Sequence, residues 1–227
     1  MGISVGIRRA RKSGRVISKA GNFARLAMQA TFLGSNHAWS GASTKASLIA
    51  VFTAVSLGTN YVLADIPNVK VMDAIVFIAA FLFGLDVGLG AAFFSRLVYG
   101  YVNPWGQVGL DLLVFLIIGE SFYAVAGSLL RRGLFARRLT VDKGTYAGWG
   151  IIFGVTGLVS TFAYDVLTNF ASYVFTTTSL FNALIIGMTT GAPFAIIHEV
   201  SNLFFFGTVA PITIVSAKRF LVVSRRI

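Results

Sequence analysis

The sequence predicts an all-α membrane protein with six transmembrane helices, and three observations support this fold class. Apolar residues make up 56% of the 227 residues, while charged residues make up only 12%, about half the usual share. The mean hydropathy is +0.79, and a soluble chain this apolar could not cover its hydrophobic surface. The cations also gather in alternate connections between the apolar stretches, as in membrane proteins.

Each apolar stretch is read as one helix, in chain order. Most come near the ~20 residues that a helical span needs, but the second and third fall short, so we expect them to tilt little or to be shielded by neighbours. The fifth connection, residues 173–190, is too short to span and too apolar for a solvent loop, so we expect a partial helix or lid there. The predicted spans are residues 46–64, 71–85, 86–101, 107–130, 145–172 and 191–217.

Charge sets the expected topology. The first 45 residues, the fourth connection and the C-terminal end carry eight, five and four of the 19 cations. The positive-inside rule therefore predicts that both termini are cytoplasmic, in a multi-pass protein of the cell membrane. We divide the chain into a basic cytoplasmic tail (1–44), a six-helix transmembrane domain (45–217) and a second basic cytoplasmic tail (218–227). The first tail is expected near anionic lipids; it lacks the interleaved aromatic residues typical of nucleic-acid binding.

Several kinds of chemistry are excluded by what the sequence lacks. Cysteine is absent and there are only two histidines, which argues against disulfides, thiol catalysis, iron–sulfur clusters and a metal site. The phosphate-binding GxxxxGK[ST], the zinc-binding HExxH and the serine-hydrolase GxSxG motifs are also missing. We therefore expect no cofactor and none of these three catalytic chemistries.

Small residues recur every fourth position in the first predicted span, which keeps them on one side of a helix. Small residues let helices approach closely in lipid, so this stripe is either an internal helix contact or a docking face for a partner membrane protein. The stripe consists of Ala46, Ala50, Ala54 and Gly58.

Polar and ionisable residues inside the spans are the main functional signal, because a buried charge in a membrane needs a partner or water. Under the predicted topology they concentrate in the outer half, which suggests an outward-facing pocket for a polar, partly aromatic small molecule. The alternative is a set of buried ion pairs beneath an aromatic belt. Glu120 pairs with Arg96 or His198, or is protonated. The candidate binding residues are Asp73, Arg96, Asp111, Asp165, Asn169, His198 and Asn202.

The arrangement resembles the substrate-binding S component of energy-coupling factor (ECF) transporters, which take up vitamins. Within residues 68–92, Asp73 matches the family's acidic position, and Gly84, Gly88 and Gly90 match its glycine-marked hairpin. The resemblance covers residues 45–217 and is carried by four stretches: the small-residue stripe, residues 68–92, YDVLTN at 164–169, and GAPF at 191–194 followed by HEVSN.

The resemblance implies a binding protein, not an enzyme, that holds a vitamin or precursor beneath the first, third and fifth connections. It also implies that the small-residue stripe docks on a transmembrane coupling subunit, which works with two ABC-type ATPases. The substrate stays open between cobalamin, a flavin, a thiamine-type precursor and a modified base. Two other classes are an integral membrane enzyme, which would need acids or histidines near the cytoplasmic interface, and a ligand-free membrane scaffold, which would have a fully packed outer half.

Overall fold

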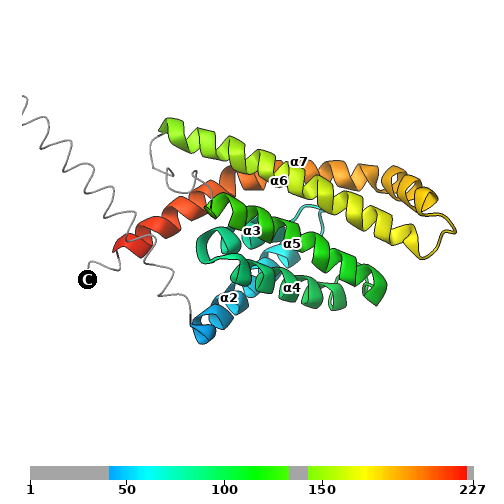
Figure 1. Ribbon diagram of the computed structural model, residues 1–227, viewed down its shortest axis with the longest axis horizontal. Helices are drawn as coiled ribbons and strands as arrows, with labels where there is room; N and C mark the ends of the chain where they lie inside the picture. The colour runs from blue at the N-terminus through cyan, green and yellow to red at the C-terminus, as the bar shows by residue number, and fades with distance from the viewer. Residues whose placement is uncertain (1–40, 133–142, 224–227) are drawn as a thin grey trace, which may run out of the picture. The chain divides into compact units, whose positions relative to one another are not determined.

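The computed structural model describes residues 41–132 and 143–223, and within them it contains six α-helices and no strand. The predicted all-α fold is confirmed. Four of the helices are long and apolar enough to cross a membrane, which indicates a multi-pass membrane protein. The predicted tail at 1–44 lies almost wholly outside the described residues. The helices are α2 (Ala42–Val62), α3 (Met72–Phe83), α4 (Leu85–Tyr101), α5 (Leu110–Arg132), α6 (Lys143–Val174) and α7 (Leu180–Val223), drawn in Figure 1.

Helix α3 is the centre of the bundle. It has only 12 residues, and every side chain from Met72 to Leu82 is buried. A helix that is apolar all round is stable only when other helices surround it, and α2, α4, α5 and α7 all pack against α3. The expectation that the short second span is shielded by its neighbours is therefore confirmed.

Aromatic rings join α3 to the helices around it. The ring of Phe77 lies 5.2 Å from that of Phe153 on α6 and 5.1 Å from that of Phe206 on α7. On α5, Gly127 lies so close to the Phe77 backbone that any larger residue would contact the Phe77 carbonyl oxygen. Tight contact at this glycine brings α5 against the central helix.

The turn between α3 and α4 is a single residue, Gly84. Its φ of 109° and ψ of 170° lie in a region that is essentially restricted to glycine. Its N–H donates to the Ala80 carbonyl oxygen at 3.0 Å, which closes the last turn of α3. Gly88 then lets α4 return close to Ala80, so a hairpin of α3 and α4 is present where the glycines predict one.

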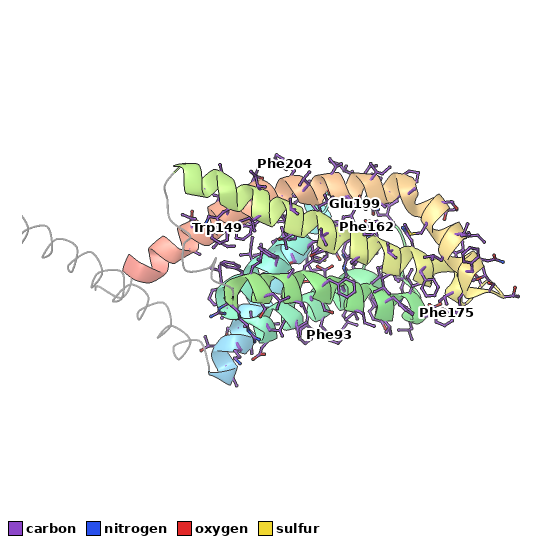
Figure 2. The ribbon with its side chains drawn as sticks, turned by 45° about the horizontal axis from the view of Figure 1, so that its top comes forward. Phe93, Trp149, Phe162, Phe175, Glu199 and Phe204 are labelled. Carbon is purple, nitrogen blue, oxygen red and sulfur yellow. The ribbon has the colours of Figure 1, made fainter. Side chains whose placement is uncertain are left out.

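The fifth connection, predicted to be a partial helix or lid, is helical from residue 180, but this helical part was not predicted to join the last span. Residues 180–190 are not a separate element but the first turns of α7, which continues for 44 residues, past the predicted end of the last span at 217. Pro193 lies inside this helix, which changes direction nearby, as Figures 1 and 2 show. Proline removes one backbone hydrogen bond and bends a helix without ending it, so the GAPF motif was misread as a helix start.

The outer surface of the bundle is apolar. Figure 2 shows Phe93, Phe162 and Phe204 on three different helices projecting away from it, and they are 42%, 54% and 61% exposed. Large exposed apolar surfaces are rare on soluble monomers and are expected where lipid replaces water.

Two connections meet at one end of the bundle, which we call the loop end. They are residues 63–71, between α2 and α3, and residues 102–109, between α4 and α5. The Trp105 indole N–H donates to the Ala64 carbonyl oxygen at 2.9 Å, and the Tyr61 hydroxyl donates to the Val102 carbonyl oxygen at 3.0 Å. These hydrogen bonds join the first and third connections.

Candidate functional site

Five ionisable side chains from five different helices form one buried cluster, which we call the charge network. Each is at most 6% exposed. In apolar surroundings charged groups are stable only when they neutralise and hydrogen-bond one another, which is why these residues converge. The charge network consists of Asp73 on α3, Arg96 on α4, Glu120 on α5, Asp165 on α6 and His198 on α7.

Asp73 is the central acceptor of the charge network. One carboxylate oxygen accepts a hydrogen bond from Arg96 Nη2 at 3.2 Å. The other lies 2.7 Å from His198 Nε2 and accepts from the Asn202 amide at 2.8 Å. Asp73 stands in the first turn of α3, where the helix dipole also favours a negative charge. One side chain therefore links α3 to α4 and α7.

His198 bridges two carboxylates. Its Nε2 faces Asp73, and its Nδ1 lies 2.9 Å from Asp165 Oδ1. An imidazole donates from both nitrogens only as the imidazolium, so hydrogen bonds to both carboxylates require either that form or a protonated carboxyl group. In each case a proton is held between α3, α6 and α7.

Arg96 connects the charge network to Glu120 and to an aromatic face. Its Nε donates to Glu120 Oε2 at 2.6 Å, so the pairing of Glu120 with Arg96, one of the options from sequence, is the one observed. The guanidinium carbon lies 5.0 Å from the centroid of the Tyr164 ring, within cation–π range. Arg96 is thus held from two sides.

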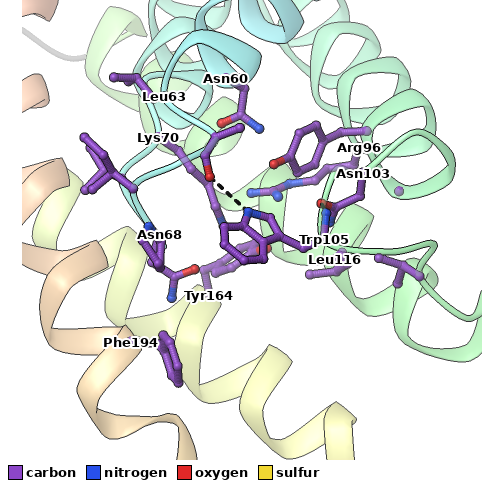
Figure 3. A pocket seen from close by; sticks show the side chains of 17 residues that line it. Asn60, Leu63, Asn68, Lys70, Arg96, Asn103, Trp105, Leu116, Tyr164 and Phe194 are labelled. Carbon is purple, nitrogen blue, oxygen red and sulfur yellow. Dashed lines mark hydrogen bonds between the residues drawn. The ribbon is translucent and has the colours of Figure 1, made fainter.

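A cavity of about 460 Å³ lies under the two connections at the loop end. Its size falls within the range of about 300–1,000 Å³ that is usual for small-molecule sites. Figure 3 shows side chains from both connections and from several helices around it, with Trp105 and Tyr164 among them. Its polar and aromatic lining consists of Asn60, Asn68, Lys70, Arg96, Tyr99, Asn103, Trp105, Tyr164 and Phe194.

Of the seven binding residues expected from sequence, only Arg96 lines this cavity. Asp165, His198 and Asp73 are used by the charge network behind it, and Asn202 is completely buried, donating to Asp73 and to Thr161. The buried ion-pair alternative therefore describes these residues. They lie on the predicted helix faces, but those faces meet one another.

The two remaining candidates lie elsewhere. Asn169 is at the contact of α6 with α7, where a side chain at Gly191 would overlap its amide. Asp111 is exposed in the first turn of α5. Neither residue lines the cavity, because its position on a helix face directs it to a neighbouring helix or to the surface.

The sequence analysis missed the polar residues in the connections. Asn68, Lys70 and Asn103 line the cavity but were read only as parts of loops. A signal was present, since Lys70 is one of only two cations that the topology places off the cytoplasmic side. Asn60 was also missed; it is 2% exposed, and its amide nitrogen has no partner among the described residues.

The small-residue stripe faces outward. Ala46, Ala50, Ala54 and Gly58 are all exposed, and a side chain placed at Gly58 would meet nothing within 4 Å. The stripe is therefore not a contact within the described part of the chain. It leaves a smooth surface along α2.

Scans against protein-family models, curated proteins and solved structures found no match to this chain. The functional interpretation consequently rests on the cavity, the charge network and the exposed stripe.

Proposed function

We propose that this chain is the membrane-embedded substrate-binding subunit of an ATP-driven importer of the ECF type. It captures a vitamin or related small molecule and delivers it together with a transmembrane coupling subunit and two ABC-type ATPases. The observation that carries the proposal is the cavity of about 460 Å³ beneath the first and third connections. This is where the resemblance to S components implies a ligand.

The proposal includes six spans with both termini in the cytoplasm. Helices α3 and α4 then complete the bundle, although α3 is too short to cross the bilayer unaided. The loop end faces outward, which leaves the cavity open to substrate from outside the cell. Lys45, Arg131 and Arg132 lie at the other end, near the turn between α3 and α4, which agrees with the positive-inside rule.

The exposed small-residue stripe supports the presence of a partner. A helix with alanine or glycine at every fourth exposed position offers close backbone approach to another membrane helix. No helix of the described part of the chain occupies this face of α2. A transmembrane coupling subunit would fit it.

The two other function classes are less well supported. A membrane enzyme needs reactive groups that reach its substrate, whereas His198 and Glu120 are 0% exposed and are bound to other side chains. A ligand-free scaffold would have a closed loop end, and a cavity lies there instead.

Native mass spectrometry of the purified protein tests the proposal, since a binding subunit retains ligand through mild detergent extraction. We expect a bound small molecule on the wild type. Ala64→Trp places an indole in the cavity and should remove it, while Ala163→Trp, a matched change at an exposed position of α6, should not. A wild type without any retained small molecule, or equal retention in both variants, would contradict the proposal.

A further inference from the structure

The charges in the cavity lining all have one sign. Among the described residues that line it, Lys70 and Arg96 carry charge and none carries a carboxylate. Arg96 is already paired with Glu120 and Asp73, so Lys70 is the cation that an anionic ligand would neutralise, whereas a cationic ligand would find no carboxylate in the lining.

Lys70 has no acidic partner in the described residues. No carboxylate there lies within 4.0 Å of its ammonium, and Asp73, Glu120 and Asp165 already bind Arg96 or His198. Its Nζ instead lies 5.8 Å from the centroid of the Tyr164 ring.

Burial, followed by the charge of Arg96, lowers the pKa of Lys70 from its ordinary value, while Asp73, Glu120 and Asp165 oppose this shift. Burial without a carboxylate inside salt-bridge distance leaves the ammonium poorly compensated where it stands. An anion placed beside it would restore that compensation.

Arg96 does not use all of its N–H donors in the charge network. Its Nε and Nη2 bind Glu120 and Asp73, but Nη1 makes no hydrogen bond within the described part of the chain. A guanidinium carries five N–H donors, so the N–H groups of Nη1 remain available to a ligand. The charge network fixes this group from behind, which favours binding because the side chain needs no further ordering.

The rest of the lining fits a ring. Tyr99, Trp105, Tyr164 and Phe194 supply aromatic surfaces from four different segments of the chain. Asn60 adds a buried amide nitrogen without a partner, and an unsatisfied buried donor is costly unless a ligand accepts from it. In Figure 3 the Asn60 amide, the Arg96 guanidinium and the Trp105 indole all lie around the cavity.

We propose that the ligand of this cavity is an organic anion, an aromatic or heteroaromatic ring bearing a carboxylate or a phosphate group. The acid group binds between Lys70 and the free side of Arg96. The ring lies among Tyr99, Trp105 and Tyr164, and one of its acceptor atoms takes the Asn60 amide hydrogen. This inference rests on the proposed capture of a small molecule and narrows the substrate class.

The proposal separates the substrates that the sequence left open. A cationic thiamine-type ring finds no carboxylate in the lining. A cobalamin is too large to enclose in about 460 Å³. A ring system carrying an acid group satisfies both the size and the charge of the site.

An affinity-selection experiment tests the charge class. The full-length protein in detergent is incubated with an equimolar mixture built on the same one-ring and two-ring scaffolds. The mixture contains aromatic carboxylates, phosphate monoesters, the corresponding neutral amides and alcohols, and the corresponding aminomethyl cations. Retained compounds are measured by mass spectrometry, and the two acid series show separately whether carboxylate or phosphate is preferred.

We expect the acids to be retained and their neutral and cationic counterparts to be lost. Lys70→Met should weaken retention of the acids by at least about tenfold, because it removes a charge-assisted contact. Lys45→Met is the matched control, since Lys45 pairs with Asp86 at the opposite end of the bundle and does not line the cavity.

The outcomes are distinguishable. The anion proposal is overturned if a neutral or cationic compound is retained in preference to its acid counterpart. It is also overturned if Lys70→Met leaves retention of the acids unchanged. In both cases the proposed capture of a small molecule still stands. If no compound of any class is retained, and the purified wild type also carries no small molecule in native mass spectrometry, both the anion proposal and the proposed function fail.

Discussion

Replacing Asp73 with alanine should destabilise the protein more than any exposed acid does. Asp73 is fully buried and accepts hydrogen bonds from Arg96 and Asn202, and its second oxygen also faces His198. The substitution leaves these groups without their common acceptor in the middle of the bundle. Asp73→Asn keeps the volume and one acceptor oxygen, so its effect should be smaller.

The magnitude follows from the geometry. Removing one partner of a buried ion pair typically costs about 3–5 kcal/mol, because the other charge stays buried without compensation. Asp73 has contacts of 2.7 to 3.2 Å with two such partners, Arg96 and His198, although each retains a second carboxylate in Glu120 or Asp165. Because each partner keeps one carboxylate, we expect the free energy of unfolding to fall by about 3–5 kcal/mol rather than by twice that value.

The assay is unfolding of the purified protein by SDS titration in mixed micelles, followed by circular dichroism. Asp111→Ala is the matched control, because Asp111 also stands in the first turn of its helix but is exposed. Loss of the helix-dipole contribution is common to both variants and amounts to about 1 kcal/mol at most for the exposed residue. Equal destabilisation by the two substitutions would refute the structural role assigned to the charge network.

Three further predictions address other parts of the chain. Ala50→Leu, on the exposed stripe, should abolish uptake and weaken association with a coupling subunit, while ligand binding persists. Equal loss of ligand binding and uptake would mean that the stripe packs inside the fold. Gly127→Leu should lower the melting temperature by overlapping the α3 backbone, whereas Gly148→Leu, in open space, should not. The pKa of Lys70 is lowered, so the affinity for an anionic ligand should be constant well below that pKa and fall as the pH rises through it. Isothermal titration at several pH values measures this affinity. An affinity that rises with pH would contradict the prediction.

The helices could be predicted from sequence because their signal is local. Apolar stretches interrupted by polar connections located the six helices of the described residues, and the shortness of the second span led to the expectation that neighbours shield it. The exception is α7, where Pro193 was read as a boundary. A proline within a lipid-facing helix can be tolerated, since neighbouring groups can satisfy the backbone around it.

The site was harder to predict because its partners are distant in the sequence. Helical spacing correctly put His198 and Asn202 on one face, but it could not show that this face meets Asp73, 125 and 129 residues away. The same limit applied to Asp165, whose partner is His198 rather than Arg96. Spacing identifies the side of a helix, whereas packing decides whether that side meets a cavity or another helix.

Helix α2 connects the two functional surfaces. It has only two buried side chains, Ser56 and Asn60, and Asn60 lines the cavity. Its opposite side carries the exposed small-residue stripe, and its first turn is joined to α4 by the Lys45–Asp86 ion pair. A ligand that binds both Asn60 on α2 and Arg96 on α4 therefore adds a contact between these helices at the loop end. Because α2 is otherwise held by so few buried groups, that contact would change how firmly the stripe is positioned, and under the proposed function ligand occupancy and partner docking would be coupled through one helix.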